Sequence, residues 1–118
     1  MKLSNTDIKL WEGLSTNMGR ECDPTVIRGQ IGFRTFFGVC GGKWAKINDY
    51  SFPCGVILFL GSSRALEVIL DFDDTYKVRR NRLVTHGVNK GDIITESETK
   101  GVYCEDLSEA VWSASCWK

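Results

Sequence analysis

Residues 54 to 85 constrain the fold more than any other part of the sequence, because three strand-sized segments follow one another there with only turns between them. Residues 54 to 60 are apolar throughout, which is typical of a central strand covered on both faces. Residues 65 to 72 also fit helical spacing, but their β-branched residues and flanking turns favour a strand. Connections this short join antiparallel neighbours, so we predict a three-stranded meander that ends with residues 76 to 85.

Two further strands are predicted between residues 28 and 47. Apolar residues alternate from Ile31 to Val39, and Gly41-Gly42 then separates this run from a second apolar-polar segment. Two glycines between alternating segments favour a type I′ turn, because both central residues of that turn need a positive φ. We therefore expect a Gly41-Gly42 hairpin that joins the meander in one sheet.

Both ends of the chain carry helix patterns. Ser4 and Asp7 have the spacing of a capping box at the start of a helix over residues 5 to 12. From Leu107 to Ala114, apolar residues recur at the spacing of an amphipathic helix. The expected fold is α+β: a single antiparallel sheet of about five strands, with a short edge strand near residue 92 and with the N- and C-terminal helices packed on one face.

The chain has 118 residues, which is enough for one globular domain spanning residues 1 to 118. Fifteen basic and fifteen acidic residues cancel, so the molecule as a whole does not attract nucleic acid or anionic lipid. The start of the sequence has no apolar signal segment, and no apolar run approaches the roughly 20 residues of a membrane-spanning helix. These observations predict a cytoplasmic protein, in the host cytoplasm if its source is a virus.

The five cysteines are widely and irregularly spaced, without a Cys-x-x-Cys pair. Zinc sites usually need two close pairs of ligands, so we expect free thiols and neither a metal nor a cofactor. The cysteines are Cys22, Cys40, Cys54, Cys104 and Cys116.

An acidic cluster follows the second strand of the predicted meander. Asp71 and Asp73, after an apolar run, resemble the nucleophile loop of haloacid-dehalogenase-type phosphatases. The resemblance implies Asp71 as nucleophile and Asp73 as acid/base in magnesium-dependent phosphate chemistry, phosphatase- or nuclease-like. That family uses a parallel sheet with long crossovers, and too few residues follow Thr75 to build one. The residues themselves therefore favour an acidic β-turn, with phosphate chemistry as the alternative.

Four basic residues, Lys77, Arg79, Arg80 and Arg82, crowd the third strand of the meander. In a strand, Lys77 and Arg79 project to one face, and Arg80 and Arg82 project to the other. Charged side chains on an edge strand hinder unwanted pairing with other chains, and this is the favoured interpretation. Contact with an acidic protein surface, or with nucleic acid through Arg79 to Arg82, is the alternative.

Trp112 and Trp117 lie near the C-terminal end of the sequence. At 3.6 residues per turn they point roughly 140° apart, with Trp117 beside the apolar stripe of the predicted helix and Trp112 off it. One core contact cannot bury both rings. Either another segment of the chain covers Trp112, or the ring belongs to a surface that binds a partner or a second copy.

We therefore hypothesise a non-catalytic binding module that docks onto a protein through Trp112 and Trp117, through the basic residues Lys77 to Arg82, or through both. A short chain of this kind is typical of viral or mobile-element accessory proteins, so inhibition or modulation of a host protein is the expected biology. A homodimer is an alternative, nucleic acid is a weaker one, and no contact with a membrane is expected.

Overall fold

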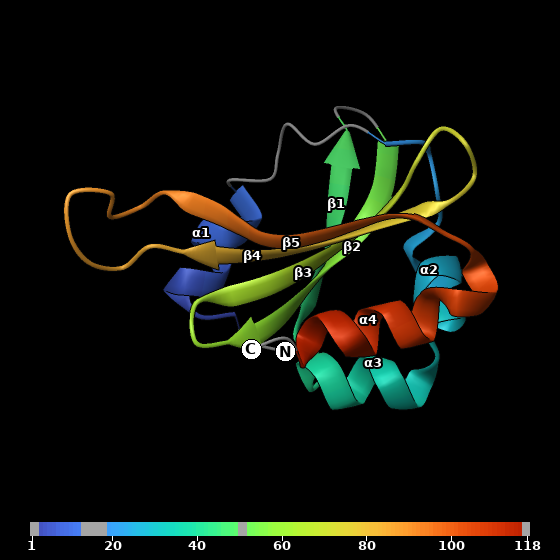
Figure 1. Cartoon of the computed structure of the whole chain (residues 1–118), viewed down its shortest axis with the longest axis horizontal. Coiled ribbons are helices and arrows are strands. Elements are labelled where there is room, and N and C mark those ends of the chain that lie inside the picture. The colour runs from blue at the N-terminus through green and yellow to red at the C-terminus, as the bar shows by residue number, and fades with distance from the viewer. Residues whose placement is uncertain (1–2, 13–18, 50–51, 117–118) are drawn as a thin grey trace.

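Figure 1 shows the computed structural model of the protein, which describes residues 3–12, 19–49 and 52–116. The helices are α1 (Asn5–Glu12), α2 (Pro24–Ile31), α3 (Phe33–Cys40) and α4 (Leu107–Ser115), and a 3₁₀ turn, η1 (Cys104–Asp106), leads into α4. The strands are β1 (Trp44–Asp49), β2 (Phe52–Gly61), β3 (Arg64–Leu70), β4 (Tyr76–Leu83) and β5 (Ile93–Val102).

The five strands form one antiparallel sheet in the order β1-β2-β3-β4-β5, so each strand pairs with its neighbour in the sequence. The predicted α+β fold and the meander over residues 54 to 85 are confirmed. Ser62 and Ser63 turn the chain between β2 and β3, and both have the positive φ that a two-residue hairpin turn needs. The predicted edge strand near residue 92 is also present, but it continues to Val102.

The strand predicted between residues 28 and 40, and the Gly41-Gly42 hairpin with it, are wrong, whereas the strand predicted after the two glycines is present as β1. This part of the chain forms α2 and α3. The Asp23 carboxylate accepts a hydrogen bond from the N–H of Thr25, and Pro24 occupies the first helical position, so this pair begins a helix. Gly41 has a φ of 61° and its N–H donates to the carbonyl of Phe37, so it ends α3 instead of turning a hairpin.

The sheet is covered on both faces, and the predicted packing of both terminal helices on one face is wrong. Figure 1 shows α2, α3 and α4 grouped on one side and α1 on the other. Successive residues of β2 alternate between the two faces: Val56 and Leu58 lie on the face covered by α2 and α3, whereas Ile57 and Phe59 lie on the α1 face. The apolar character of β2 on both sides is thus explained by helices on both faces.

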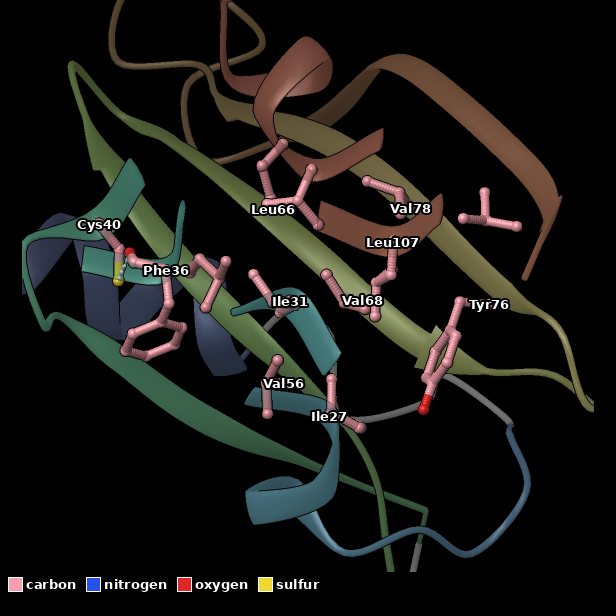
Figure 2. Packing of buried hydrophobic residues seen from close by; sticks show 13 residues of the cluster. Ile27, Ile31, Phe36, Cys40, Val56, Leu66, Val68, Tyr76, Val78 and Leu107 are labelled. Atoms are coloured by element: carbon pink, nitrogen blue, oxygen red, sulfur yellow. Dashed lines mark hydrogen bonds between the residues drawn. The ribbon is translucent and has the colours of Figure 1, made fainter. Parts of the chain in front are cut away.

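The larger core lies between the sheet and the three helices α2, α3 and α4 (Figure 2). In it, Leu107 and Val111 of α4 meet Leu66 and Val68 of β3, and Phe36 of α3 is buried in the same cluster. Burial of such side chains is the main favourable contribution to folding. α4 is therefore fixed to the middle of the sheet by its apolar side, and its opposite side faces outward.

On the other face, α1 begins with the predicted capping box. The Asp7 N–H donates to the Ser4 hydroxyl at 3.1 Å, and the Ser4 N–H donates to the Asp7 carboxylate at 3.2 Å. Leu10 is buried in the smaller core, and the Trp11 indole N–H donates to the carbonyl of Lys46 on edge strand β1 at 2.7 Å. None of the helices among the described residues is long and apolar enough to cross a membrane.

Candidate functional site

Large aromatic rings are exposed on both helices of the α3–α4 pair. Phe33 and Phe37 of α3 are 79% and 46% exposed, and Trp112 of α4 is 52% exposed. The rings of Phe33 and Phe37 stack one helical turn apart, with centroids 4.5 Å from each other. Monomeric proteins rarely expose large apolar side chains in groups. We call these three exposed residues of the α3–α4 pair the aromatic surface.

The two helices that carry these rings, α3 and α4, pack against each other. The hydroxyls of Thr35 and Ser108 lie 2.7 Å apart in a hydrogen bond near the start of both helices. Further along, a Cβ on Gly38 would lie 3.4 Å from the Trp112 ring, so the indole packs over the glycine. The two helices therefore run side by side in the same direction, as Figure 1 shows. Gly38 lets Trp112 lie close against α3.

Of the two tryptophans named in the sequence analysis, the structure describes Trp112. Trp112 lies off the buried stripe of α4, which Leu107 and Val111 form, and more than half of its surface is exposed. Trp117 lies outside the described residues. Phe33 and Phe37 were missed as surface residues because they were assigned to a strand. Their i, i+4 spacing on a helix was the signal that could have placed the two rings together on one exposed face of α3.

The interpretation of the basic residues as an edge strand is wrong, because β4 lies between β3 and β5. The predicted division between two faces is confirmed by the register. Lys77 and Arg79 lie on the α1 face, and Arg80 and Arg82 lie on the α4 face. The four charges therefore form two separate groups.

On the α4 face, three arginines surround one carboxylate. The Nε atoms of Arg64, Arg80 and Arg82 lie 3.0, 3.0 and 3.3 Å from the carboxylate oxygens of Glu96. Burial disfavours the charged carboxylate, but the hydrogen bonds and charges of Arg64 and Arg80 outweigh it and hold the pKa of Glu96 below its ordinary value. Arg80 also donates to the carbonyls of Ala114 and Ser115 at the end of α4, at 2.8 and 3.1 Å.

On the α1 face, Glu67 is completely buried and accepts a hydrogen bond from the amide of Asn81. Arg79 lies between two carboxylates, with Nη1 3.4 Å from Glu67 and Nε 3.0 Å from Glu98. Burial raises the pKa of Glu67, although the charge of Arg79 and the bond from Asn81 offset part of this effect. Arg79 is thus engaged within the fold, with only 19% of its side chain exposed.

Asp71 and Asp73 lie in the turn between antiparallel strands β3 and β4. Asp73 accepts hydrogen bonds from the hydroxyl and the N–H of Thr75, and these bonds lower the pKa of Asp73. The N–H of Asp71 donates to the carbonyl of Thr75 at 2.8 Å and closes the turn. The antiparallel order contradicts the parallel sheet that the phosphatase resemblance implies, and the β-turn is confirmed.

The five cysteines are free thiols, as predicted. Cys40 and Cys54 are buried, Cys22 is half-buried, and Cys104 and Cys116 are exposed. Burial raises the pKa of the Cys40 thiol, which favours its unreactive neutral form. Among the described residues, no group of three or more histidine, cysteine, aspartate or glutamate side chains is placed to hold a metal ion.

A comparison of the chain with protein families, curated proteins and solved structures finds no match. The function must therefore be inferred from the geometry of the molecule itself.

Proposed function

We propose that the protein is a non-catalytic binding module that docks onto another protein through the aromatic surface. The observation that supports this proposal most strongly is the exposure of Trp112 on α4 and of Phe33 and Phe37 on α3, two helices that are fixed to each other. Tryptophan is among the residues most enriched at the energetic centres of protein interfaces. A partner that covered these rings would remove a large apolar area from water.

The helices that carry the rings are also anchored in the larger core. Phe36 and Cys40 anchor α3 in the larger core, and Leu107 and Val111 anchor α4. Phe33, Phe37 and Trp112 lie outside the buried part of that core, although Phe37 lies edge-on to Phe36 and Trp112 packs over Gly38. A surface used for docking accounts for aromatic residues at such positions.

The proposal extends to the expected biology, in which the partner is a host protein that docking inhibits or modulates. The alternative is magnesium-dependent phosphate chemistry at Asp71 and Asp73. Both carboxylates have a part in the backbone turn between β3 and β4, which favours a structural role for them. Hydrolysis of a phosphate ester with Mg²⁺ that disappears in Asp71→Asn would favour the alternative.

The test begins with capture of a partner by the full chain, its identification by mass spectrometry, and purification of that partner. Its affinity is then measured for the wild type, Trp112→Ala, Phe37→Ala and a control, Phe72→Ala. Phe72 is an exposed aromatic residue in the β3–β4 turn. It therefore resembles Phe37 and Trp112 in chemical type but lies outside the aromatic surface. We expect losses of about 2 kcal/mol or more for Trp112→Ala and a smaller loss for Phe37→Ala, with Phe72→Ala unchanged. Equal binding by all variants, or failure to capture any partner, would contradict the proposal.

A further inference from the structure

The strongest unexplained feature outside the aromatic surface is the arginine group on the α4 face. Arg64 of β3 and Arg82 of β4 are direct cross-strand partners, so their side chains leave the sheet side by side. Like charges in this position repel each other and destabilise a sheet. A sequence that places them there without a need in the core suggests a role in binding.

Glu96 holds these two arginines in place but does not neutralise them. The register between β4 and β5 shifts between Arg80 and Asn81, and Glu96 lies at that irregularity. Its single carboxylate is the one ion-pair partner of Arg64 and Arg82 in the described part of the chain, so one negative charge faces these two positive ones. Among the described residues, Arg64 and Arg82 therefore retain excess positive charge.

The remaining donors face solvent. The side chains of Arg64 and Arg82 are 32% and 37% exposed. Arg82 contacts Glu96 through Nε, and in the described part of the chain its two Nη groups meet no acceptor. Arg64 donates from Nη1 to the carbonyl of Ser62 at 3.3 Å, which leaves Nη2 available. Two guanidinium groups thus present N–H donors from adjacent strands.

We propose that Arg64 and Arg82 bind a single phosphate group. Planar guanidinium groups bind phosphate oxygens with paired, charge-assisted hydrogen bonds, and a phosphate dianion matches the excess positive charge. Glu96 fixes both side chains before the ligand arrives, in the way that a supporting carboxylate orients a binding group. The site is distinct from the aromatic surface and does not depend on the docking proposal.

The ligand is one phosphate and not a nucleic-acid strand. Binding of a strand needs a positively charged path along several phosphates, usually with exposed aromatic rings on which bases stack. Here Lys77 and Arg79 lie on the opposite face of the sheet, and Arg79 is engaged with Glu67 and Glu98. The basic residues of β4 therefore do not form a continuous path.

The test is a titration of the full chain with inorganic phosphate, monitored through the NMR signals of the arginine Nε–H groups. A titration with sodium chloride at equal ionic strength is the reference. We expect saturable shifts of the Arg64 and Arg82 signals with phosphate only. Arg82→Gln should weaken binding by about tenfold or more, and so should Arg64→Gln. The control Lys90→Gln removes one positive charge from the exposed β4–β5 loop and should leave binding unchanged. Phosphate-induced shifts no larger than those caused by chloride would overturn the proposal, and so would an Arg82→Gln variant that binds phosphate as tightly as the wild type.

Two further arms identify the source of the phosphate and separate binding from structure. Phosphoserine peptides that bind more tightly than inorganic phosphate, with the same loss in Arg82→Gln, would indicate a phosphorylated protein; equal or weaker binding would indicate a free phosphate. A single-stranded oligonucleotide that binds when phosphate does not would overturn the proposal in favour of nucleic acid. Glu96→Gln keeps a side-chain oxygen that can accept from the arginines but removes the competing negative charge, so phosphate binding should strengthen. A purely structural arginine group would lose stability without that gain.

Discussion

Gly55 on β2 lies so close to Val68 on β3 that a Cβ atom at position 55 would overlap the Val68 carbonyl oxygen. The same Cβ would lie 3.0 Å from the Cα of Ile69. Both neighbours are backbone atoms in the centre of the sheet, so they cannot rotate away as a side chain can. The separation of β2 and β3 at this point therefore depends on glycine.

Gly55→Ala should destabilise the protein by about 3 kcal/mol or more, because the added methyl group forces two central strands apart. The matched control is Gly29→Ala on the exposed side of α2, where a Cβ would meet nothing within 4 Å. That change should stabilise the protein by about 0.5–1 kcal/mol, since alanine is the better helix former. Urea unfolding measures both variants. Unchanged stability of Gly55→Ala would contradict the close approach of β2 and β3, and a loss of stability in Gly29→Ala would contradict the open space beside α2.

Glu67 and Glu96 should give opposite pH dependences of stability. The pKa of Glu67 is raised in the fold, so its contribution to stability is complete below its ordinary value of 4.5 and is lost as the pH rises through the higher folded value. Glu67→Gln removes this loss. The free energy of unfolding of Glu67→Gln relative to wild type should therefore increase from pH 4 to pH 7.

The pKa of Glu96 is lowered, so its contribution is present above its ordinary value of 4.5 and is lost as the pH falls through the lower folded value. Glu96→Gln should consequently lose most stability relative to wild type near pH 7 and approach it in acid. Thermal unfolding of both variants at several pH values provides the measurement. Parallel curves for the two variants would refute the assigned directions.

Arg80→Leu should release the end of α4. The substitution leaves the carbonyls of Ala114 and Ser115 without the donor they now share, at an expected cost of about 1–3 kcal/mol. Hydrogen exchange should accelerate in the last turn of α4 more than in α3. Arg34→Gln, at an exposed position of α3, is the control and should change stability by about 0.5 kcal/mol or less. Unchanged exchange in α4 would show that Arg80 does not hold the helix.

Thiol alkylation of the native protein should divide the cysteines by burial. Cys104 and Cys116 are exposed and should react first, whereas Cys40 and Cys54 should react only after unfolding in denaturant. The raised pKa of Cys40 adds to its protection, because less thiolate is present. Mass spectrometry of tryptic peptides identifies the modified sites. Rapid native labelling of Cys54 would contradict its place in the core below α1.

The sheet could be predicted from the sequence where strands follow one another with tight turns. Residues 54 to 85 met this condition, and local pattern alone was sufficient there. The run from Ile31 to Val39 was misassigned because its apolar residues satisfy both a period of two and a spacing of four. Asp23-Pro24 was the decisive local signal, since the same two residues that favour a turn also cap and begin a helix.

In the candidate sites, features that depend on one element could be predicted from the sequence, whereas contacts between elements could not. Trp112 was predictable because its position off the apolar stripe depends on one helix only. The partners of Arg80 and Arg82 were not predictable, because Glu96 and Arg64 come from other strands and meet them only through the register of the sheet. Likewise, Gly38 approaches Trp112 only through the pairing of α3 with α4.

The attachment of α4 at both ends has a consequence for recognition. Thr35 holds the beginning of the helix through Ser108, and Arg80 holds its last carbonyls, so the segment that carries Trp112 is fixed before any partner arrives. Association would then freeze few new degrees of freedom in this molecule, which lowers the entropic penalty of complex formation. A rigid indole also selects for a complementary hollow, so shape fit is expected to decide which proteins are bound.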